Sequence, residues 1–270
     1  MTCDARPVSG TRRVVHNRAL KRRLHIAAAT SQWRTAQRLE LNFWRRWTAL
    51  APYRDLDIPA YWSSELARYG QTGECFRDRR VLDVGCGPFG LIHYADHAAE
   101  RICIDPLLPQ YRRTLPGRTP DGTQLSICAM GEALPLAEGS IDIAICHNAL
   151  DHMLDPGAAL EEISRVLRPG GRALLMIHTF PAWLRPLYFL DRMHPHHFTA
   201  QSFASIVRSH LGIERCETSP RHFDAPAGRW WAPSFWKYLA ENLVTSSTYV
   251  LAERASTRVP GMTNLVPAGA

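Results

Sequence analysis

The sequence predicts an α/β domain built on a mostly parallel sheet, with helices on both faces and a helical extension before it. Two patterns carry this prediction. From Arg80 onward, short apolar runs alternate with helical stretches, as in chains that build successive strand–helix–strand units. The first run, at 80–84, leads directly into a turn with glycines at positions 85, 87 and 90. Because such a sheet binds ligands at the carboxyl ends of its strands, this turn also marks the expected site.

Before that run the chain is expected to be largely helical. Residues 1–13 carry no periodic pattern and are expected to be disordered. Val14–Trp47 contains two helix-like stretches in which apolar residues are spaced three and four apart. Prolines at 52 and 59 then precede a further helix at Ala60–Tyr69.

Strands and helices alternate after residue 80. Strands are expected at 80–84, 101–104, 125–129, 141–146 and 172–178. A helix at Ala200–His210 leads to a strand at Ile213–Thr218, and a last strand is expected at Thr245–Ala252. The final run, from Ser256 to Ala270, has no periodicity, so we expect it to be frayed.

The composition fits one globular α/β domain with additions. The chain has 270 residues, 46% of them hydrophobic and 21% charged, and no apolar run approaches the roughly 18 residues of a membrane span. The first ten residues have no signal-peptide core. Seven cysteines include no C-x-x-C pair, and Cys103 and Cys146 lie in apolar runs. Buried free thiols in a reducing cytoplasm are therefore expected, rather than a disulfide framework.

The net charge of +7 is concentrated near the N-terminus. Residues 1–50 hold eleven Lys and Arg against two acids. Such a basic arm can meet nucleic acid, an acidic substrate or a phosphate-bearing carrier, or it can be a solvated helical face. Because only two of the 32 basic residues are lysines, genomic composition is a further explanation of the bias.

Two acids frame the glycine turn. Asp83 lies inside the first strand, where a buried carboxylate needs a partner such as a ligand ammonium or the N–H groups of the loop. Asp105 lies twenty residues after Gly85, at a strand end where a carboxylate can accept two ribose hydroxyls. Asp105 can also cap a helix that starts at Pro106, and the two roles are compatible. The glycines allow a sharp turn and a helix that starts at Leu91 with its N–H groups facing the ligand.

Several segments, in order, resemble the class I S-adenosylmethionine-dependent methyltransferases, a seven-stranded Rossmann-like family. The likeness covers about residues 75–218. Its segments are Asp83–Gly87 as the first motif, Gly131–Leu136 as the segment that passes the adenine, Ser140–Cys146 as the fourth strand and Leu167–Gly171 as the turn before the fifth strand at Arg172–Ile177. The resemblance implies a methyltransferase, with S-adenosylmethionine as its cofactor.

The resemblance also implies a division of the chain. Residues 71–254 form the cofactor-binding domain, with an aromatic insertion near 221–239. Residues 1–70 form a basic arm and a helical lid over the cofactor cleft, and residues 255–270 form a flexible tail.

The family's cofactor contacts carry over onto matching positions. They are Asp83, Gly85, Cys86, Gly87, Asp105, Pro106, Gly131, Glu132 and His147. Two positions depart from the family pattern. Met130 stands where an acid often precedes the adenine segment, so backbone carbonyls or other side chains are expected to hold the adenine amine. Phe89 stands where the third glycine often falls, so the loop geometry is expected to differ slightly.

The residues after the fourth strand are the first candidates for catalysis. Methyl transfer from a sulfonium needs the acceptor in line and water excluded, while an acid–base residue is optional. His147 lies at the strand's carboxyl end, and His152, five residues later, lies on the expected acceptor side. His152 can equally be a helix residue bonded to Asp151, Asp155 or the backbone.

Substrate contacts are expected from the histidine-rich and aromatic segments near the C-terminus. The candidates are His178, His194, His196 and Trp230. Trp230 belongs to an aromatic segment that either forms a lid over the acceptor or packs beneath the sheet edge. No metal is expected, because no nearby Cys or paired carboxylate completes a set with His194, His196 and His197.

The leading interpretation is methyl transfer to an O or N acceptor on a small molecule, such as a sugar, a lipid-linked intermediate or a natural product. Enzymes that methylate exocyclic base amines carry an Asn/Asp-Pro-Pro-aromatic run after the fourth strand, whereas this chain has His147–Leu150 there. Nucleic acid is therefore the second class of partner. The alternatives are an RNA-binding or RNA-modifying protein of this fold that uses the basic arm, and an oxidoreductase that binds NAD or NADP at the same glycines. The sequence leaves the acceptor, the oligomeric state and the pathway open.

Overall fold

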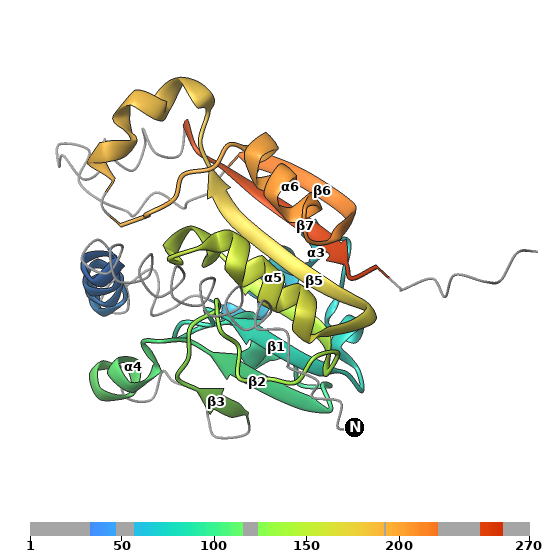
Figure 1. Cartoon of the computed structure of the whole chain (residues 1–270). Helices are drawn as coiled ribbons and strands as arrows, with labels where there is room; N and C mark the ends of the chain where they lie inside the picture. Colours follow the sequence, from blue (N-terminus) through green and yellow to red (C-terminus); the bar gives the residue numbers. More distant parts are fainter. Residues whose placement is uncertain (1–32, 47–56, 116–123, 192, 221–243, 256–270) are drawn as a thin grey trace, which may run out of the picture.

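The computed structural model describes residues 33–46, 57–115, 124–191, 193–220 and 244–255. Figure 1 shows one layered body in which helices cover both faces of a twisted sheet. Three expectations lie outside the described residues: the disordered start at 1–13, the aromatic segment around Trp230 and the tail at 256–270.

Seven strands of the described chain form one sheet in the order β3-β2-β1-β4-β5-β7-β6. Their bounds are β1 Arg80–Val84, β2 Glu100–Ile104, β3 Leu125–Ile127, β4 Ile141–His147, β5 Leu167–Thr179, β6 Gly212–Pro220 and β7 Ser246–Glu253. The strands β1 to β5 pair in parallel, while β7 runs antiparallel between β5 and β6. All seven expected strands and the mostly parallel sheet are confirmed. The strand order reverses between β1 and β4, so a crevice for ligands opens at the carboxyl ends of these two strands.

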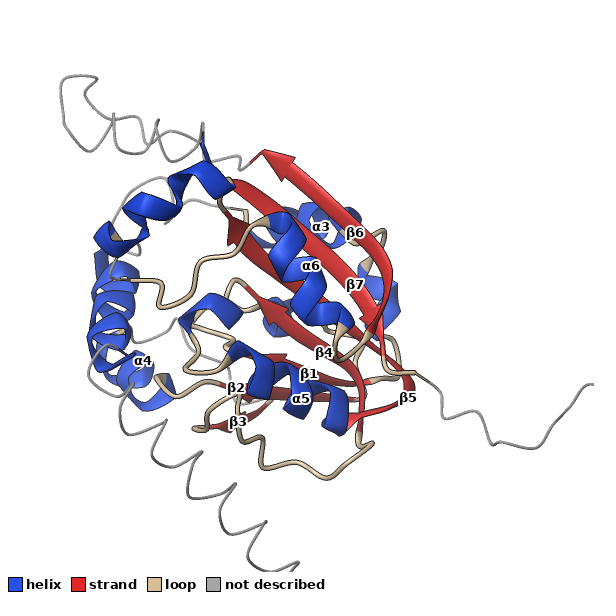
Figure 2. Cartoon of the chain, turned by 45° about the horizontal axis from the view of Figure 1, so that its top comes forward, coloured by secondary structure: helices blue, strands red, loops and turns tan. Residues whose placement is uncertain are grey.

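Helices and short 3-10 turns connect the strands. The α-helices are α3 Ile58–Arg68, α4 Leu108–Thr114, α5 Pro156–Val166 and α6 Ala200–Arg208, and residues 33–46 form a further helix. The 3-10 segments are η1 Gly73–Phe76, η2 Leu91–Tyr94, η3 Leu150–His152 and η4 Ala182–Leu190. Figure 2 shows α5 and α6 on one side of the sheet and α3 on the other.

The core consists of two apolar clusters, one on each face of the sheet. Leu82 and Val84 of β1 point into the cluster that α5 and α6 cover. Val81 of the same strand points into the cluster with Leu66 of α3 and Ile92 of η2. This alternation, with both faces buried, explains why the strands read as continuous apolar runs in the sequence.

The strand β5 starts earlier than expected. The Leu167–Gly171 segment, expected as a turn, belongs to the strand because Ile141 pairs with Leu167 before the register shifts. Gly170 has a φ angle of 74°, which lets the chain bend within this region without strain.

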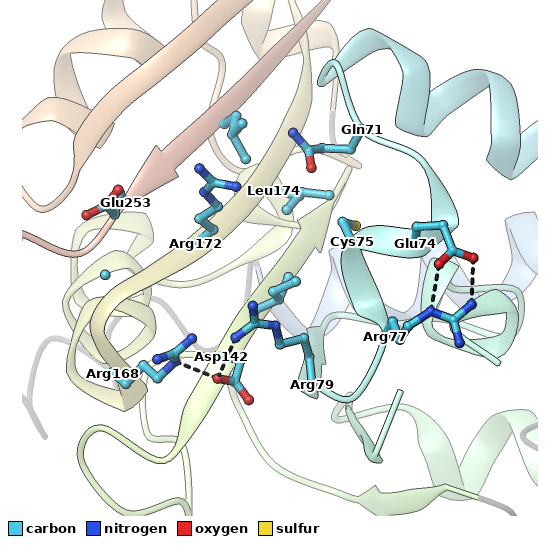
Figure 3. A pocket seen from close by; sticks show the side chains of 13 residues that line it. Gln71, Glu74, Cys75, Arg77, Arg79, Asp142, Arg168, Arg172, Leu174 and Glu253 are labelled. Carbon is cyan, nitrogen blue, oxygen red and sulfur yellow. Dashed lines mark hydrogen bonds and ion pairs between the residues drawn. The ribbon is translucent and has the colours of Figure 1, made fainter. Parts of the chain in front are cut away.

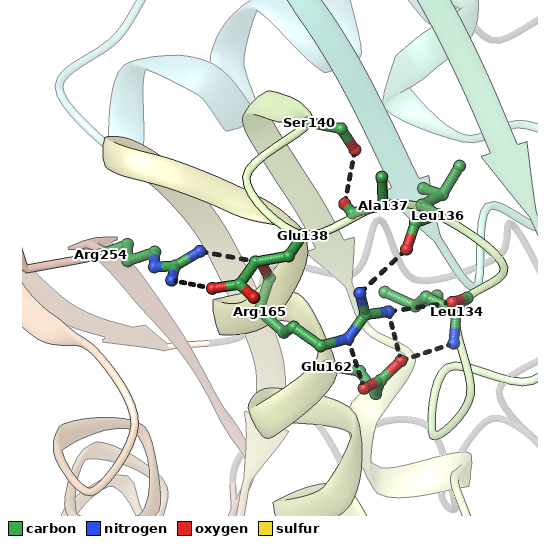
Figure 4. Close-up of polar contacts among 8 residues, drawn as sticks. All are labelled: Leu134, Leu136, Ala137, Glu138, Ser140, Glu162, Arg165 and Arg254. Atoms are coloured by element: carbon green, nitrogen blue, oxygen red, sulfur yellow. Dashed lines mark hydrogen bonds and ion pairs between the residues drawn. The ribbon is translucent and has the colours of Figure 1, made fainter.

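An arginine of α5 holds the loop between β3 and β4, as Figure 4 shows. Arg165 makes two hydrogen bonds to the carboxylate of Glu162, both 2.8 Å long. It also donates to the carbonyls of Leu136 at 2.9 Å and Leu134 at 3.0 Å. Because the guanidinium is planar and offers several donors, one side chain fixes the end of the expected adenine segment to α5.

Two further expectations concern thiols and membranes. Six cysteines in the described chain are unpaired, and Cys103 and Cys146 are buried as expected. The described helices include none with the length and apolar character that crossing a bilayer requires.

Candidate active site

The glycine loop follows β1 and lies against the chain that follows β4. Gly85 and Gly87 have positive φ angles of 74° and 55°, which other residues adopt only with strain. A Cβ on Gly85 would lie 2.4 Å from the Cβ of Ala149. Two parallel segments therefore approach each other closely at the crevice, and only glycine fits at the contact.

Asp105, at the end of β2, fastens this loop. Its Oδ2 accepts the N–H of Gly87 at 3.0 Å, and its Oδ1 accepts the N–H of Leu107 at 2.7 Å. Burial raises the pKa of Asp105 to about 6, although both N–H donors lower it. The expected helix-capping role of Asp105 is wrong, because α4 begins at Leu108 rather than at Pro106 and has Leu107 as its N-cap. Pro106 follows Asp105 in the chain, and the buried Cys86 precedes Gly87, whose N–H this carboxylate accepts.

Asp83 of β1 binds the backbone just after the glycine loop. Its Oδ2 accepts the N–H of Ile92 at 3.2 Å, so a loop N–H supplies the partner that a buried carboxylate needs. Burial raises the pKa of Asp83 to about 7, the Ile92 bond lowers it and the charge of Asp105 raises it further. A Cβ on Gly90 would lie 2.5 Å from this oxygen.

The expected helix start at Leu91 is wrong. The segment after the glycines is the 3-10 turn η2, which ends at Tyr94. Its Ile92 N–H is bonded to Asp83 rather than directed toward a ligand. Since β2 begins at Glu100, the chain between Gly90 and that strand has room for only a short turn before it must change direction.

The helix at residues 33–46 packs over the glycine loop. A Cβ on Gly87 would lie 3.5 Å from the ring of Trp44. The same ring lies 5.8 Å from that of Phe89, and its Nε1 donates to Glu40 at 2.6 Å. Trp44 also packs against the apolar cluster around Tyr111 of α4. Two elements far apart in the sequence thereby enclose the loop and Asp105.

The expected adenine segment lies at the same edge of the sheet. A Cβ on Gly131 would meet Met153 at 2.9 Å and Val84 at 3.1 Å, so the segment passes close to the end of β1. The carboxylate of Glu132 accepts the N–H of Leu154 at 2.7 Å. Glu132 therefore braces the chain after η3, a role that its sequence position did not indicate.

His147 ends β4 and faces α3. Its Nδ1 lies 3.1 Å from the hydroxyl of Tyr69, and its Nε2 lies 3.3 Å from the carboxylate of Glu65. Tyr249 of β7 donates to the same carboxylate at 2.9 Å. Burial alone would raise the pKa of Glu65, but the His147 contact and the Tyr249 hydrogen bond lower it below its ordinary value. Both ring nitrogens of His147 are therefore directed to side chains of α3 and of Tyr69, the residue that caps its C-terminus.

His152 lies at the centre of a second polar cluster. The ring of His152 is 4.6 Å from that of His194, measured between centroids. Its Nδ1 lies 3.7 Å from Glu40, on the helix that covers the glycine loop. The neighbouring Asp151 is only 2% exposed. The structure thus brings His152 and His194 together at the edge of the crevice.

Asp191 organises the histidine-rich segment. Its Oδ2 lies 2.7 Å from Nδ1 of His194 and 3.1 Å from Nε2 of His197. Burial lowers the pKa of His194, but the Asp191 contact outweighs it, and the charges of Asp151 and Glu40 add to the rise, to about 8. The two histidines in turn hold the pKa of Asp191 far below its usual range despite its burial.

Of the other candidates, His178 lies on β5, His196 adjoins this cluster and Trp230 is outside the described chain. His178 lies 3.1 Å from the hydroxyl of Ser247 on β7. The Nε2 of His196 lies 3.2 Å from the carbonyl of Leu154.

A cavity of about 330 Å³ lies at the other end of the strands, away from the glycine loop. Its lining includes Arg79 and Arg168, which both pair with Asp142 at the start of β4, as Figure 3 shows. It opens at the amino ends of the strands, so it has no part in the crevice that holds Asp105 and the glycine loop.

The sheet order, the glycine loop and the acid at the end of β2 define an α/β methyltransferase fold of the Rossmann-like type. Residues 82–175 match the family model of a methyltransferase domain. This part of the chain is thus a methyltransferase domain similar to the class I S-adenosylmethionine-dependent methyltransferases.

Two curated proteins illustrate this similarity. An uncharacterized methyltransferase of Mycobacteroides abscessus is 39% identical over 121 residues, which are 42% of this chain and 44% of that protein. The malonyl-[acyl-carrier protein] O-methyltransferase of Pseudescherichia vulneris is 33% identical over 158 residues, which are 55% of this chain and 60% of that protein. The chain therefore spans about half the length of these relatives.

The fold is also that of a solved structure from Streptomyces coelicolor A3(2). This is a geranyl diphosphate C-methyltransferase in complex with Mg²⁺, geranyl diphosphate and S-adenosyl-L-homocysteine. It superposes with a TM-score of 0.54 at 14% identity, covering 73% of this chain and 77% of that one. At this identity the likeness concerns the fold alone.

Proposed function

We propose that this protein transfers a methyl group from S-adenosylmethionine to an O or N acceptor on a small molecule. One observation carries the proposal. The glycine loop after β1 is joined to Asp105 through the N–H of Gly87 at the point where the strand order reverses. The match to a methyltransferase domain and the cofactor product in the Streptomyces structure support the choice of S-adenosylmethionine.

The residues at the crevice fit this cofactor. At Gly85 and Gly87 a side chain would meet Ala149 or Trp44, so the loop presents bare backbone there. A flat ligand can lie against this backbone. Asp105 would accept the ribose hydroxyls, and Gly131 would line the adenine side. Asn148, at the end of β4, has a buried Oδ1 with no partner among the described residues, so it can accept a hydrogen bond from the methionine part. When bound, the cofactor supplies an electrophilic methyl group on a sulfonium.

The helix at 33–46 serves as the lid of this site. Trp44 and Phe89 shield the glycine loop from water, and exclusion of water favours transfer to the intended acceptor over hydrolysis. This role extends the proposed division of the chain, in which residues 1–70 form the arm and lid.

His152 is the proposed acid–base residue. Its ring lies beside His194 and Asp151 at the crevice edge, where it can take a proton from an acceptor hydroxyl or ammonium. Such a group contributes about 10²–10⁴-fold to a rate.

A small acceptor is favoured over nucleic acid. The Pseudescherichia relative methylates an oxygen on a carrier-bound malonyl group, as its name states, and the Streptomyces structure contains geranyl diphosphate. The basic arm on which the RNA alternative depends is mostly outside the described residues. The unpaired cysteines support a reducing, cytoplasmic location.

Calorimetric titration with S-adenosylmethionine tests the cofactor assignment. The wild-type chain should bind, and Asp105→Ala should weaken binding at least tenfold. Asp96→Ala is the matched control, because Asp96 precedes β2 whereas Asp105 follows it, and the Asp96 side chain is 75% exposed and pairs with Arg101. Equal binding by wild type and Asp105→Ala would remove Asp105 from the site, and absence of binding by the wild type would reject the proposed function.

A further inference from the structure

Three side chains with metal-binding atoms converge beside the crevice. Asp151 and His152 come from η3, and His194 comes from the segment after η4. One ligand atom from each of them lies within 4.8 Å of the other two. In a tetrahedral site with ligand atoms about 2.1 Å from the ion, these atoms are about 3.4 Å from one another. The three side chains therefore need to close by at most about 1.4 Å, which small rotations of their χ angles can supply.

In the part of the chain that the structure describes, the carboxylate of Asp151 lacks the hydrogen-bond partner that a buried charge requires. Its side chain is buried, and neither oxygen has a hydrogen-bond partner among the described residues. Leaving a buried carboxylate unpaired costs free energy, so such groups are paired or coordinate metals. The Nδ1 of His152 is likewise buried without a hydrogen bond. Two adjacent residues of the same cluster thus have buried polar atoms without a hydrogen bond to any described residue.

His194 is held in the orientation of a metal ligand. Asp191 contacts its Nδ1 at 2.7 Å, which leaves Nε2 as the nitrogen available to an ion. A carboxylate on the far nitrogen is the usual outer support of a metal-bound imidazole. The chain on either side is fixed as well, because the N–H of His196 donates to the carbonyl of Asp151 at 3.2 Å.

We propose that Asp151, His152 and His194 bind a divalent transition-metal ion. Two imidazoles and one carboxylate suit zinc, iron, cobalt or nickel better than magnesium or calcium, which prefer oxygen ligands. Glu40, with its Oε2 3.7 Å from Nδ1 of His152, lies beside the three ligands and adds negative charge that favours a cation. The sequence did not indicate this set, because the completing carboxylate lies more than forty residues before His194.

The role of the ion rests on the proposed function, whereas its binding does not. Three protein ligands leave a coordination position open, as in catalytic rather than structural sites. An acceptor oxygen at that position would become more acidic. In this arrangement His152 is a ligand, and the ion takes over the activation of the acceptor.

The test is a titration of the tag-free, chelator-treated full chain with Co²⁺, followed by displacement with Zn²⁺. Wild type should give the visible absorption of protein-bound cobalt with a 1:1 endpoint. His194→Ala and Asp151→Asn should weaken binding at least 100-fold, and Asp191→Asn by about 10–100-fold. His210→Ala is the control, since the half-buried His210 follows α6 and is not part of the three-residue set, so this variant should bind like wild type. Circular dichroism confirms that each variant is folded.

Equal cobalt binding by wild type and His194→Ala would overturn the proposal, and so would a wild type that binds no cobalt. The titration is repeated on Asp105→Ala, whose metal binding should be unchanged. Binding of S-adenosylmethionine without metal binding would reject the ion alone. Metal binding without S-adenosylmethionine binding would reject the proposed function alone.

Discussion

The N–H of Gly87 donates to Oδ2 of Asp105 across 3.0 Å, so the glycine loop of β1 and the acid of β2 act as one unit. Any ligand that engages the carboxylate also acts on the loop. This coupling makes the loop glycines and the acid interdependent in both stability and binding.

The two positive-φ glycines should differ in their sensitivity to substitution. Gly87→Ala should lower the free energy of unfolding by about 1–2 kcal/mol, the cost of the left-handed conformation. Gly85→Ala should cost more, because its Cβ would also overlap that of Ala149. Urea unfolding of both variants measures the difference, and equal losses would show that the close contact with Ala149 is not rigid.

Trp44 should contribute to cofactor affinity. Trp44→Ala removes the ring that lies over Gly87 and beside Phe89, and we expect S-adenosylmethionine affinity to fall about tenfold, or about 1.4 kcal/mol. Leu39→Ala, on the exposed side of the same helix, is the matched control. Calorimetry of both variants checks this, and a similar loss in the two would assign the effect to the helix as a whole.

Asp83 should make stability depend on pH. Its pKa is raised from 3.8 to about 7 in the folded state, so the folded chain keeps a proton that the unfolded chain releases. Its contribution to the free energy of unfolding is greatest below pH 3.8 and is lost as the pH rises to about 7. Asp83→Asn cannot ionise but still offers Ile92 an acceptor.

The variant should therefore gain stability relative to wild type between pH 4 and pH 7, with a constant difference above about pH 8. Urea unfolding at a series of pH values gives this difference directly. A difference that does not change with pH would mean that Asp83 ionises in the folded chain as it does in water.

The hydroxyl of Tyr249 should stabilise the buried Glu65. Tyr249→Phe removes a 2.9 Å hydrogen bond to this carboxylate and should cost about 1.5–3 kcal/mol, as for other bonds to charged groups. Tyr94→Phe is the control, because the Tyr94 hydroxyl makes no hydrogen bond within the described chain. Thermal unfolding of the two variants tests this, and indistinguishable melting temperatures would contradict it.

The sequence predicted the sheet well because its signals are local. The apolar runs from Val81 to Ile177 are buried on both faces, so each strand was visible from its own residues. A loop N–H as partner of Asp83 followed from its place two residues before Gly85, whereas the hydrogen bond from Gly87 to Asp105 was not predicted. The helix at Leu91 was predicted wrongly because its apolar pattern does not reveal how soon β2 begins. The short segment before that strand holds only the 3-10 turn η2.

The contacts between distant segments could not be predicted. Glu65 and Tyr249 meet across 184 positions, and neither residue has a sequence feature that marks the pairing. Trp44 over Gly87 and Asp151 beside His194 are likewise products of the fold. A list of histidines and acids indicated which side chains carry chemistry, but only the packing of the elements brings particular ones together.

The placement of β7 limits how this protein can be shortened. This strand lies between β5 and β6, and Tyr249 and Val250 from it enter the two core clusters. A fragment restricted to residues 82–175 would end inside β5, with that strand's free edge and apolar faces open to pairing with other chains. The segment by which the family is recognised is thus smaller than the unit that folds, and expression work needs the chain at least through Glu253.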